Sequence, residues 1–176
     1  PPPPPFQAED GIRDALVGLV GSEMCIRDSG NLADWWTEAD RAAFEERTRA
    51  LVEQFNAFEP VAGMHINGEL TLGENIGDLS GVAMAYRAYI HSLDGKEPPV
   101  IDGFTGAQRF FIGYAMSRKG KYQDEATISR LASDPHSPLK YRVIGPYRNI
   151  DAFHEAFGTT EGDGMWLPPG QRVNIW

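Results

Sequence analysis

Residues 70–81 read LTLGENIGDLSG, and this stretch predicts a helix that carries two carboxylates on one face. Glu74 and Asp78 lie four residues apart, so in a helix their side chains project from the same side, one turn apart. An apolar stripe recurs beside them at helical spacing, formed by Leu72, Ile76, Leu79 and Val82. A carboxylate beside a core face needs a cation, a hydrogen-bond donor or a metal to offset the loss of water. Spacing alone also fits a solvated acidic edge on an ordinary helix, so the flanking sequence has to decide.

The flanking sequence resembles one enzyme family. Residues 67–78, NGELTLGENIGD, are similar to the signature NGxLTLGENIADLGG of the neprilysin-like zinc metallopeptidases. The resemblance implies that Glu74 is the third zinc ligand and that Asp78 orients a zinc-bound histidine. Both roles suit the chemistry, because catalytic zinc commonly takes two His and one carboxylate, and an outer carboxylate fixes the tautomer of a ligand histidine. Gly77 and Ser80 depart from the signature, each replacing one small residue by another.

A second element resembles the same family. Residues 134–146, DPHSPLKYRVIGP, are similar to its HSPxxxRxxG pattern. The resemblance implies that His136 stabilises the oxyanion of the transition state and that Arg142 holds a backbone carbonyl of the substrate. Without the family, a turn histidine that caps local backbone is the simpler interpretation of His136. The likeness runs essentially unbroken from Gly30 to Trp176.

One departure concerns residues 116–118, where the family commonly has Gln-x-Trp and this chain has Met-Ser-Arg. In the family that Trp lies near the pocket for the residue after the cleaved bond. Arg118 would therefore alter this pocket, or it marks a local shift of register.

The HExxH motif of the family is absent. That motif places two zinc-binding histidines one turn apart on a helix, with a Glu between them as general base. The four histidines here are His65, His91, His136 and His154, and none pairs with another at that spacing. The resemblance places HExxH ahead of Gly30, within residues 1–29, which resemble nothing in the family. We expect His65 to be structural, and His91 and His154 to face solvent on helices.

Residues 1–29 have an unusual composition. Five prolines precede two peptides, FQAEDGIRD at 6–14 and GSEMCIRDS at 21–29, that resemble translated sequencing-adapter DNA. We predict that this segment is an artefact joined to a truncated gene; a genuine divergent N-terminus is the alternative. A secretory signal does not suit Glu9 and Asp10 with no basic residue before them. The apolar run at 15–20 is too short to span a membrane.

Composition limits the remaining possibilities. A net charge of −9 argues against nucleic acid or an anionic membrane as partner. With 41% hydrophobic residues the chain is globular rather than disordered. The sole cysteine, Cys25, lies in the suspect segment, which separates residues 30–176 from cysteine-rich animal members and indicates a bacterial protein. The compartment stays open, with the periplasm preferred to the cytoplasm.

Periodicity and breakers predict a mainly α chain. Helices are expected at about 37–55, 72–93, 108–119, 124–133 and 149–157, separated by Pro- and Gly-bearing loops. Phe110, Phe111 and Tyr114 are expected in the core rather than in a substrate pocket. Together with the resemblance, this assigns residues 30–176 to the C-terminal part of a thermolysin-like (gluzincin) catalytic domain, truncated before the HExxH helix.

The resemblance implies a zinc-dependent metalloendopeptidase that hydrolyses oligopeptides with metal-activated water. One zinc ion is implied, with two His ligands absent from this chain, and the upstream domain that encloses the site is missing as well. We therefore expect the chain alone to be inactive and to hold no stoichiometric zinc. The alternative is a non-catalytic binding or scaffold module derived from a peptidase domain. Retention of Glu74, Asp78, His136 and Arg142 together argues against it.

Overall fold

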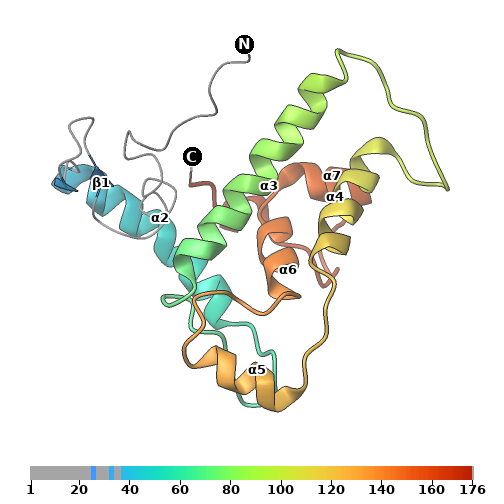
Figure 1. Cartoon of the computed structure of the whole chain (residues 1–176). Coiled ribbons are helices and arrows are strands. Elements are labelled where there is room, and N and C mark those ends of the chain that lie inside the picture. Colours follow the sequence, from blue (N-terminus) through green and yellow to red (C-terminus); the bar gives the residue numbers. More distant parts are fainter. Residues whose placement is uncertain (1–24, 27–31, 34–36, 176) are drawn as a thin grey trace, which may run out of the picture. The chain divides into compact units, whose positions relative to one another are not determined.

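The computed structural model describes residues 25–26, 32–33 and 37–175 (Figure 1). The chain forms two compact units, 1–45 and 46–176. In the first unit, β1 (Cys25–Ile26) pairs antiparallel with β2 (Leu32–Ala33), with Cys25 opposite Ala33. Apart from β1, residues 1–29 lie outside the described residues. The prediction that they are an artefact therefore stays a prediction.

The described chain is mainly helical, as predicted. Its helices are α2 (Glu38–Asn56), α3 (Leu72–Ser92), α4 (Gly106–Ser117), α5 (Asp124–Leu131), α6 (Tyr141–Arg148) and α7 (Asp151–Phe157), followed by a 3₁₀ turn, η2 (Pro169–Gln171). None of the helices in this part of the chain combines the length and apolarity that a membrane span needs.

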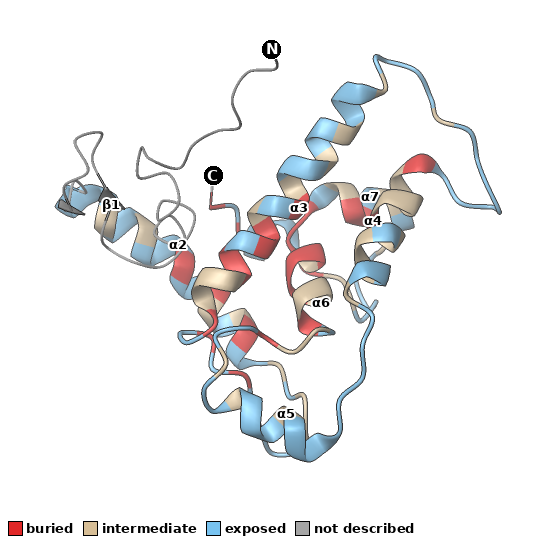
Figure 2. Ribbon diagram, viewed as in Figure 1, coloured by how far each residue is buried: buried red, intermediate tan, exposed pale blue. Residues whose placement is uncertain are grey.

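Helix α3 forms because its apolar stripe packs on the core. Ile76, Leu79 and Val82 are buried in its first half, whereas most of the second half is exposed (Figure 2). The helix ends where Asp94 and Gly95 adopt left-handed backbone angles, φ +50° and +73°, which glycine tolerates most readily. The predicted range, 72–93, is therefore confirmed to within a residue.

The core lies where α2, α4, α6 and α7 bring large side chains together. Leu51 and Phe55 of α2 and Phe111 of α4 are fully buried. The Phe111 ring stacks on Tyr86 of α3 at 5.1 Å and meets Tyr147 and Phe153 edge-on. Aromatic pairs at such distances add to the hydrophobic gain of burial. The core assignment of Phe111 is confirmed.

Helix α6 was not predicted, because Gly145 and Pro146 in its sequence are typical helix breakers. Gly145 is required by packing, since a Cβ at this position would collide with the ring of Phe55. Pro146 lies inside the helix and is almost fully buried. Helix α6 lies beside α3 (Figure 1). Burial of its Tyr141 and Tyr147 outweighs its weak intrinsic propensity.

His154 corrects an expectation. It was expected to face solvent, but it is 5% exposed and both ring nitrogens have partners, Thr159 Oγ1 at 2.5 Å and the Arg148 carbonyl at 3.0 Å. Helix α7 is short, and Trp166 of the loop after it packs edge-on against His154. The loop therefore covers a helix face that the sequence pattern alone assigned to solvent.

Candidate functional site

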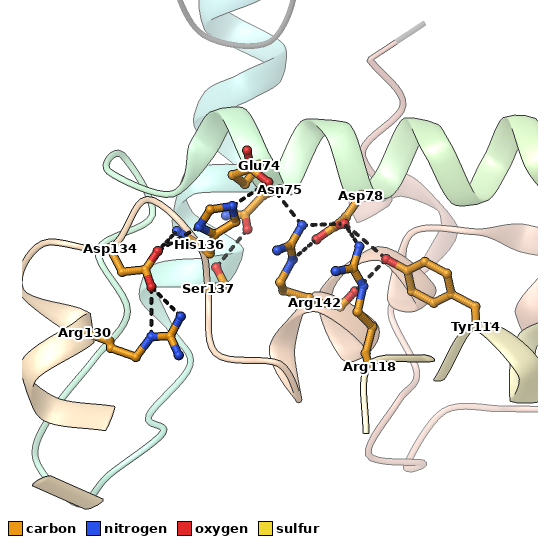
Figure 3. Close-up of polar contacts among 10 residues, drawn as sticks. All are labelled: Glu74, Asn75, Asp78, Tyr114, Arg118, Arg130, Asp134, His136, Ser137 and Arg142. Atoms are coloured by element: carbon orange, nitrogen blue, oxygen red, sulfur yellow. Dashed lines mark hydrogen bonds and ion pairs between the residues drawn. The ribbon is translucent and has the colours of Figure 1, made fainter. Parts of the chain in front are cut away.

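Helix α3 sets the two carboxylates of the signature one turn apart, in different surroundings (Figure 3). The Asp78 side chain is 5% exposed and the Glu74 side chain 42% exposed. Asp78 lies on the buried side of the helix, so its charge needs partners from other elements. Glu74 lies at the surface of the molecule, where a ligand or a metal ion has access to it.

Arg142 of α6 joins both carboxylates. Its Nε and Nη2 donate to Asp78 Oδ2 and Oδ1 at 2.6 and 2.9 Å, which is a two-pronged pairing. The same Nη2 donates to Glu74 Oε2 at 3.1 Å. Burial alone would lower the pKa of Arg142, but the hydrogen bonds and charge of Asp78, with the charge of Glu74, outweigh it and raise the pKa. Arg142 is therefore a permanently charged anchor between the two acids.

Tyr114 of α4 contacts Asp78 and a backbone carbonyl that Pro146 leaves without its helical partner. A proline has no N–H, so the carbonyl of Arg142, four residues earlier, lacks its helical partner. The hydroxyl of Tyr114 lies 3.3 Å from that carbonyl and 3.2 Å from Asp78 Oδ1. Burial, and then the charge of Asp78, raise the pKa of Tyr114, so it is a neutral donor at ordinary pH. Helix α4 is thus the third element that contacts Asp78, after α3 and α6.

His136 lies between two carboxylates. Its Nε2 is 3.2 Å from Glu74 Oε2, and its Nδ1 is 2.8 Å from Asp134 Oδ1. Both contacts are attractive at once only when each nitrogen carries a hydrogen. Asp134 also accepts the backbone N–H of His136 at 3.0 Å and the Nε–H of Arg130 at 2.8 Å, and its Oδ2 forms an ion pair with Arg130 Nη2 at 2.8 Å.

The pKa of Asp134 is lowered to about 2. The backbone N–H of His136 contributes most; burial opposes the shift, and the His136 ring and Arg130 add to it. Asp134 therefore stays ionised and fixes the orientation of the His136 ring over a wide pH range.

A buried hydrogen-bond chain fixes this loop to α3. Ser137 Oγ donates to Asn75 Oδ1 at 2.8 Å, and Asn75 Nδ2 donates to Thr71 Oγ1 at 2.9 Å. Ser137 is 2% and Asn75 1% exposed. Because Asn75 directly follows Glu74, this chain sets the distance between His136 and Glu74.

A cavity of about 260 Å³ opens beside these groups. His136 and Arg142 form part of its wall, and Leu131 and Leu139 supply an apolar part. Polar groups that converge at the edge of a partly apolar hollow are typical of ligand sites.

As a metal site, the described residues are incomplete. Nowhere in the described part of the chain do three His, Cys, Asp or Glu residues form a group that could hold a metal ion. Glu74 suits one ligand position, because its side chain is partly exposed and the contacts above fall on a single oxygen, Oε2. A catalytic zinc site needs further ligands. The residues present thus supply one ligand of such a site.

Comparison with known proteins agrees with the signature. The sequence model of peptidase family M13 matches residues 18–173. The chain belongs to peptidase family M13. Mouse membrane metallo-endopeptidase-like 1 is 39% identical to it over 191 residues, and human neprilysin is 35% identical over 192 residues. Each alignment covers 98% of this chain and 25% of the relative, so this M13 chain spans about a quarter of those proteins.

Solved structures resemble it in fold as well as in sequence. The crystal structure of Mycobacterium tuberculosis zinc metalloprotease Zmp1 in complex with an inhibitor is 48% identical, with a TM-score of 0.81, and the match covers 85% of this chain and 24% of that one. The cryo-EM structure of Zmp1 in the open state is 43% identical, with a TM-score of 0.83, and the match covers 98% of this chain and 30% of that one. The resemblance to neprilysin-like zinc metallopeptidases is therefore confirmed. The M13 match begins within residues 1–29, and the boundary at Gly30 stays a prediction.

The four site residues that the sequence predicts lie in contact with one another in a single cluster: Glu74, Asp78, His136 and Arg142 (Figure 3). Their individual roles stay predictions. Sequence reasoning missed Asp134, although its place two residues before His136, ahead of a proline, is typical of a side chain that bonds nearby backbone. It also assigned Tyr114 to the core, since nothing local shows a hydroxyl meeting a carboxylate 36 residues away.

Proposed function

We propose that the whole protein is a zinc-dependent metalloendopeptidase that hydrolyses oligopeptides, and that residues 30–176 supply one zinc ligand and the groups that hold the reacting peptide. The observation that carries the proposal is the cluster itself: in an M13 chain, an accessible Glu74 lies beside Arg142 and His136, each within 3.2 Å. A carboxylate, a fixed cation and a fixed imidazole at one place can hold a metal and a developing oxyanion.

Glu74 is the residue that would hold zinc, and Asp78 would orient a ligand histidine from the upstream part of the enzyme. Zinc, when bound, polarises the scissile carbonyl and activates the attacking water. Asp78 suits its role because α3 and Arg142 hold its carboxylate in one orientation, and such outer partners typically change metal affinity or activity by about 10- to 100-fold.

His136 and Arg142 would act on the peptide. Asp134 fixes the His136 ring, so that the opposite nitrogen, Nε2, is aimed across Glu74 and can donate to an oxyanion. Arg142 uses Nε and Nη2 on Asp78 and Glu74. In the described part of the chain no acceptor for its Nη1 is found, which suits Nη1 for a substrate carbonyl.

A chimera tests this function. Residues 30–176 would replace the matching segment of the Mycobacterium tuberculosis zinc metalloprotease, whose remaining chain supplies the other parts of an active enzyme. We expect one zinc ion per chain and hydrolysis of a fluorogenic peptide. Glu74→Gln should lose zinc and lower kcat/KM by more than about 100-fold, and His136→Gln should lower kcat by about 100-fold with zinc retained.

Glu69→Gln is the matched control, because Glu69 is an exposed carboxylate five residues from Glu74. It should change neither zinc content nor rate. A folded chimera that keeps zinc and activity after Glu74→Gln would refute the proposal. A folded chimera without any hydrolysis would favour the non-catalytic binding module instead.

The 176-residue chain alone should neither bind zinc stoichiometrically nor hydrolyse the peptide, because a single carboxylate gives only weak zinc affinity. Metal analysis after dialysis against zinc measures this directly. One tightly bound zinc per chain would contradict it.

A further inference from the structure

Arg118 brings a second guanidinium to Asp78. It follows α4 directly, and its Nη2 donates to Asp78 Oδ1 at 3.0 Å, the same oxygen that accepts from Arg142 Nη2 at 2.9 Å. The two guanidinium groups therefore lie side by side (Figure 3). The Arg118 guanidinium also lies 5.5 Å from the centre of the Tyr114 ring, a distance at which a cation interacts with an aromatic face. These contacts hold the group in place.

Two guanidinium groups share the carboxylate of Asp78. Arg142 already pairs with Asp78 through two parallel bonds, so one negative charge faces two positive ones. The Glu74 carboxylate is engaged by Arg142 and His136. The Arg118 side chain keeps 30% of its surface exposed, whereas that of Arg142 keeps 11%. Arg118 is thus the accessible cation of the pair, and its exposed side is open to an incoming carboxylate.

The surrounding segment is basic in an acidic protein. Residues 118–142 hold six Lys or Arg against three Asp or Glu, although the chain carries a net charge of −9. Lys119 and Lys121 are exposed beside Arg118. Between them, Gly120 packs so closely on Leu139 that a Cβ would collide with it, and Leu139 lines the cavity next to His136 and Arg142. The basic run therefore borders the cavity of the proposed site.

We propose that Arg118 determines specificity, by favouring peptides that carry an acidic side chain beside the bond whose carbonyl Arg142 holds. This inference rests on the proposed contact between Arg142 and the substrate. A guanidinium presents several donors in a plane that match a carboxylate. The partner is an acidic peptide rather than nucleic acid, since the charge of the rest of the chain repels a polyanion.

Direct binding to the 176-residue chain tests the inference without zinc or hydrolysis. Two capped short peptides, identical except for one Glu or Gln, would be titrated and followed by NMR. The Glu peptide should bind about two- to fivefold more tightly at low ionic strength, as expected for an exposed ion pair, and the difference should shrink in high salt. Arg118→Gln should abolish the difference, and Arg118→Lys should keep part of it.

Lys96→Gln is the matched control, because Lys96 is an exposed cation in the loop after α3. It should leave the Glu preference unchanged, and circular dichroism checks that each variant is folded. Equal binding of both peptides, a preference that survives Arg118→Gln, or an equal loss in Lys96→Gln would overturn the inference. Competition by inorganic phosphate as strong as by the Glu peptide would also overturn it, because that marks a general anion site.

The peptidase chimera separates this inference from the proposed function. If the chimera hydrolyses peptides, its kcat/KM for the Glu substrate relative to the Gln substrate should fall toward one in Arg118→Gln, with the rate for the Gln substrate retained. If it hydrolyses nothing, the proposed function fails, and the binding titration still decides whether Arg118 selects acidic peptides.

Discussion

Asp78 is a buried acid whose removal leaves the buried cation Arg142 behind. Its side chain is 5% exposed and that of Arg142 is 11% exposed. Deleting one partner of a buried ion pair is strongly destabilising, because the remaining charge loses its compensation. Asp78→Ala should therefore lower the free energy of unfolding in urea by about 3 kcal/mol. The double variant Asp78→Leu/Arg142→Met should recover part of that loss.

An ion pair whose acid is exposed provides the contrast. Arg172 Nη1 lies 2.5 Å from Asp151 Oδ1, but the Asp151 side chain is 75% exposed. Asp151→Ala should cost less than about 1 kcal/mol. Equal losses in Asp78→Ala and Asp151→Ala would show that burial does not set the strength of the Asp78 pairing.

Asp134 makes stability depend on pH in the acid range. Folding lowers its pKa to about 2, from the 3.8 of an unperturbed aspartate. The folded state thus favours the ionised form; the resulting stabilisation is complete above about pH 4 and is lost as the pH falls through 2. Urea unfolding between pH 6 and pH 2 should show a smaller decrease in Asp134→Asn than in the unaltered chain. Glu161→Gln, an exposed carboxylate, should retain the full decrease.

At the scale of elements, one side chain joins α2, α6 and the C-terminal segment. Asn149 Nδ2 donates to Gln54 Oε1 and to the Gly145 carbonyl, and its Oδ1 accepts from Gln54 Nε2 and the Val173 amide. Asn149→Ala leaves buried polar groups without partners, so it should cost about 2–4 kcal/mol in urea unfolding. Hydrogen exchange at the Val173 amide should accelerate.

The exposed Asn174 is the control for this junction. Asn174→Ala should change neither the unfolding free energy nor exchange at Val173. If Asn149→Ala accelerates exchange everywhere equally, the side chain stabilises the fold as a whole and does not specifically fix the C-terminal segment.

The elements differ in how far the sequence could predict them. Helix α3 follows from its apolar period and α4 from its apolar run around Phe111. The capping box of Thr105 and Gln108 starts α4 at Gly106, earlier than the predicted Gln108. Helix α6 does not follow from the local sequence, because Gly145 is explained only by Phe55, far away in the sequence. The same holds in the site: Glu74 and Asp78 are local, whereas Tyr114 and Arg118 reach Asp78 from 36 and 40 residues away. Contacts over such separations depend on tertiary packing, which local patterns do not contain.

At the scale of the whole molecule, apolar side chains are exposed on the second half of α3 and in the loop after it. The residues are Met84 at 62%, Ile90 at 46%, Val100 at 64%, Ile101 at 49% and Phe104 at 44% exposure. Exposed apolar patches favour association and dye binding. We expect the chain to enhance fluorescence of the dye ANS and to self-associate as its concentration rises in analytical ultracentrifugation. Met84→Gln/Ile90→Gln should reduce both effects, because it removes apolar surface at exposed helical positions without opening the core.

Ile128→Gln separates this surface from the general hydrophobicity of the chain. Ile128 is 39% exposed, but it lies on α5, a helix without buried residues. This change should leave dye binding and association as they were. If both variants reduce them equally, the exposed surface of α3 has no special part, and association reflects a loosely packed chain. If only the α3 variant reduces them, association occurs through the exposed apolar surface of α3. Helix α3 then serves two purposes along its length, because its first turns carry Glu74 and Asp78 and its last turns present an apolar face.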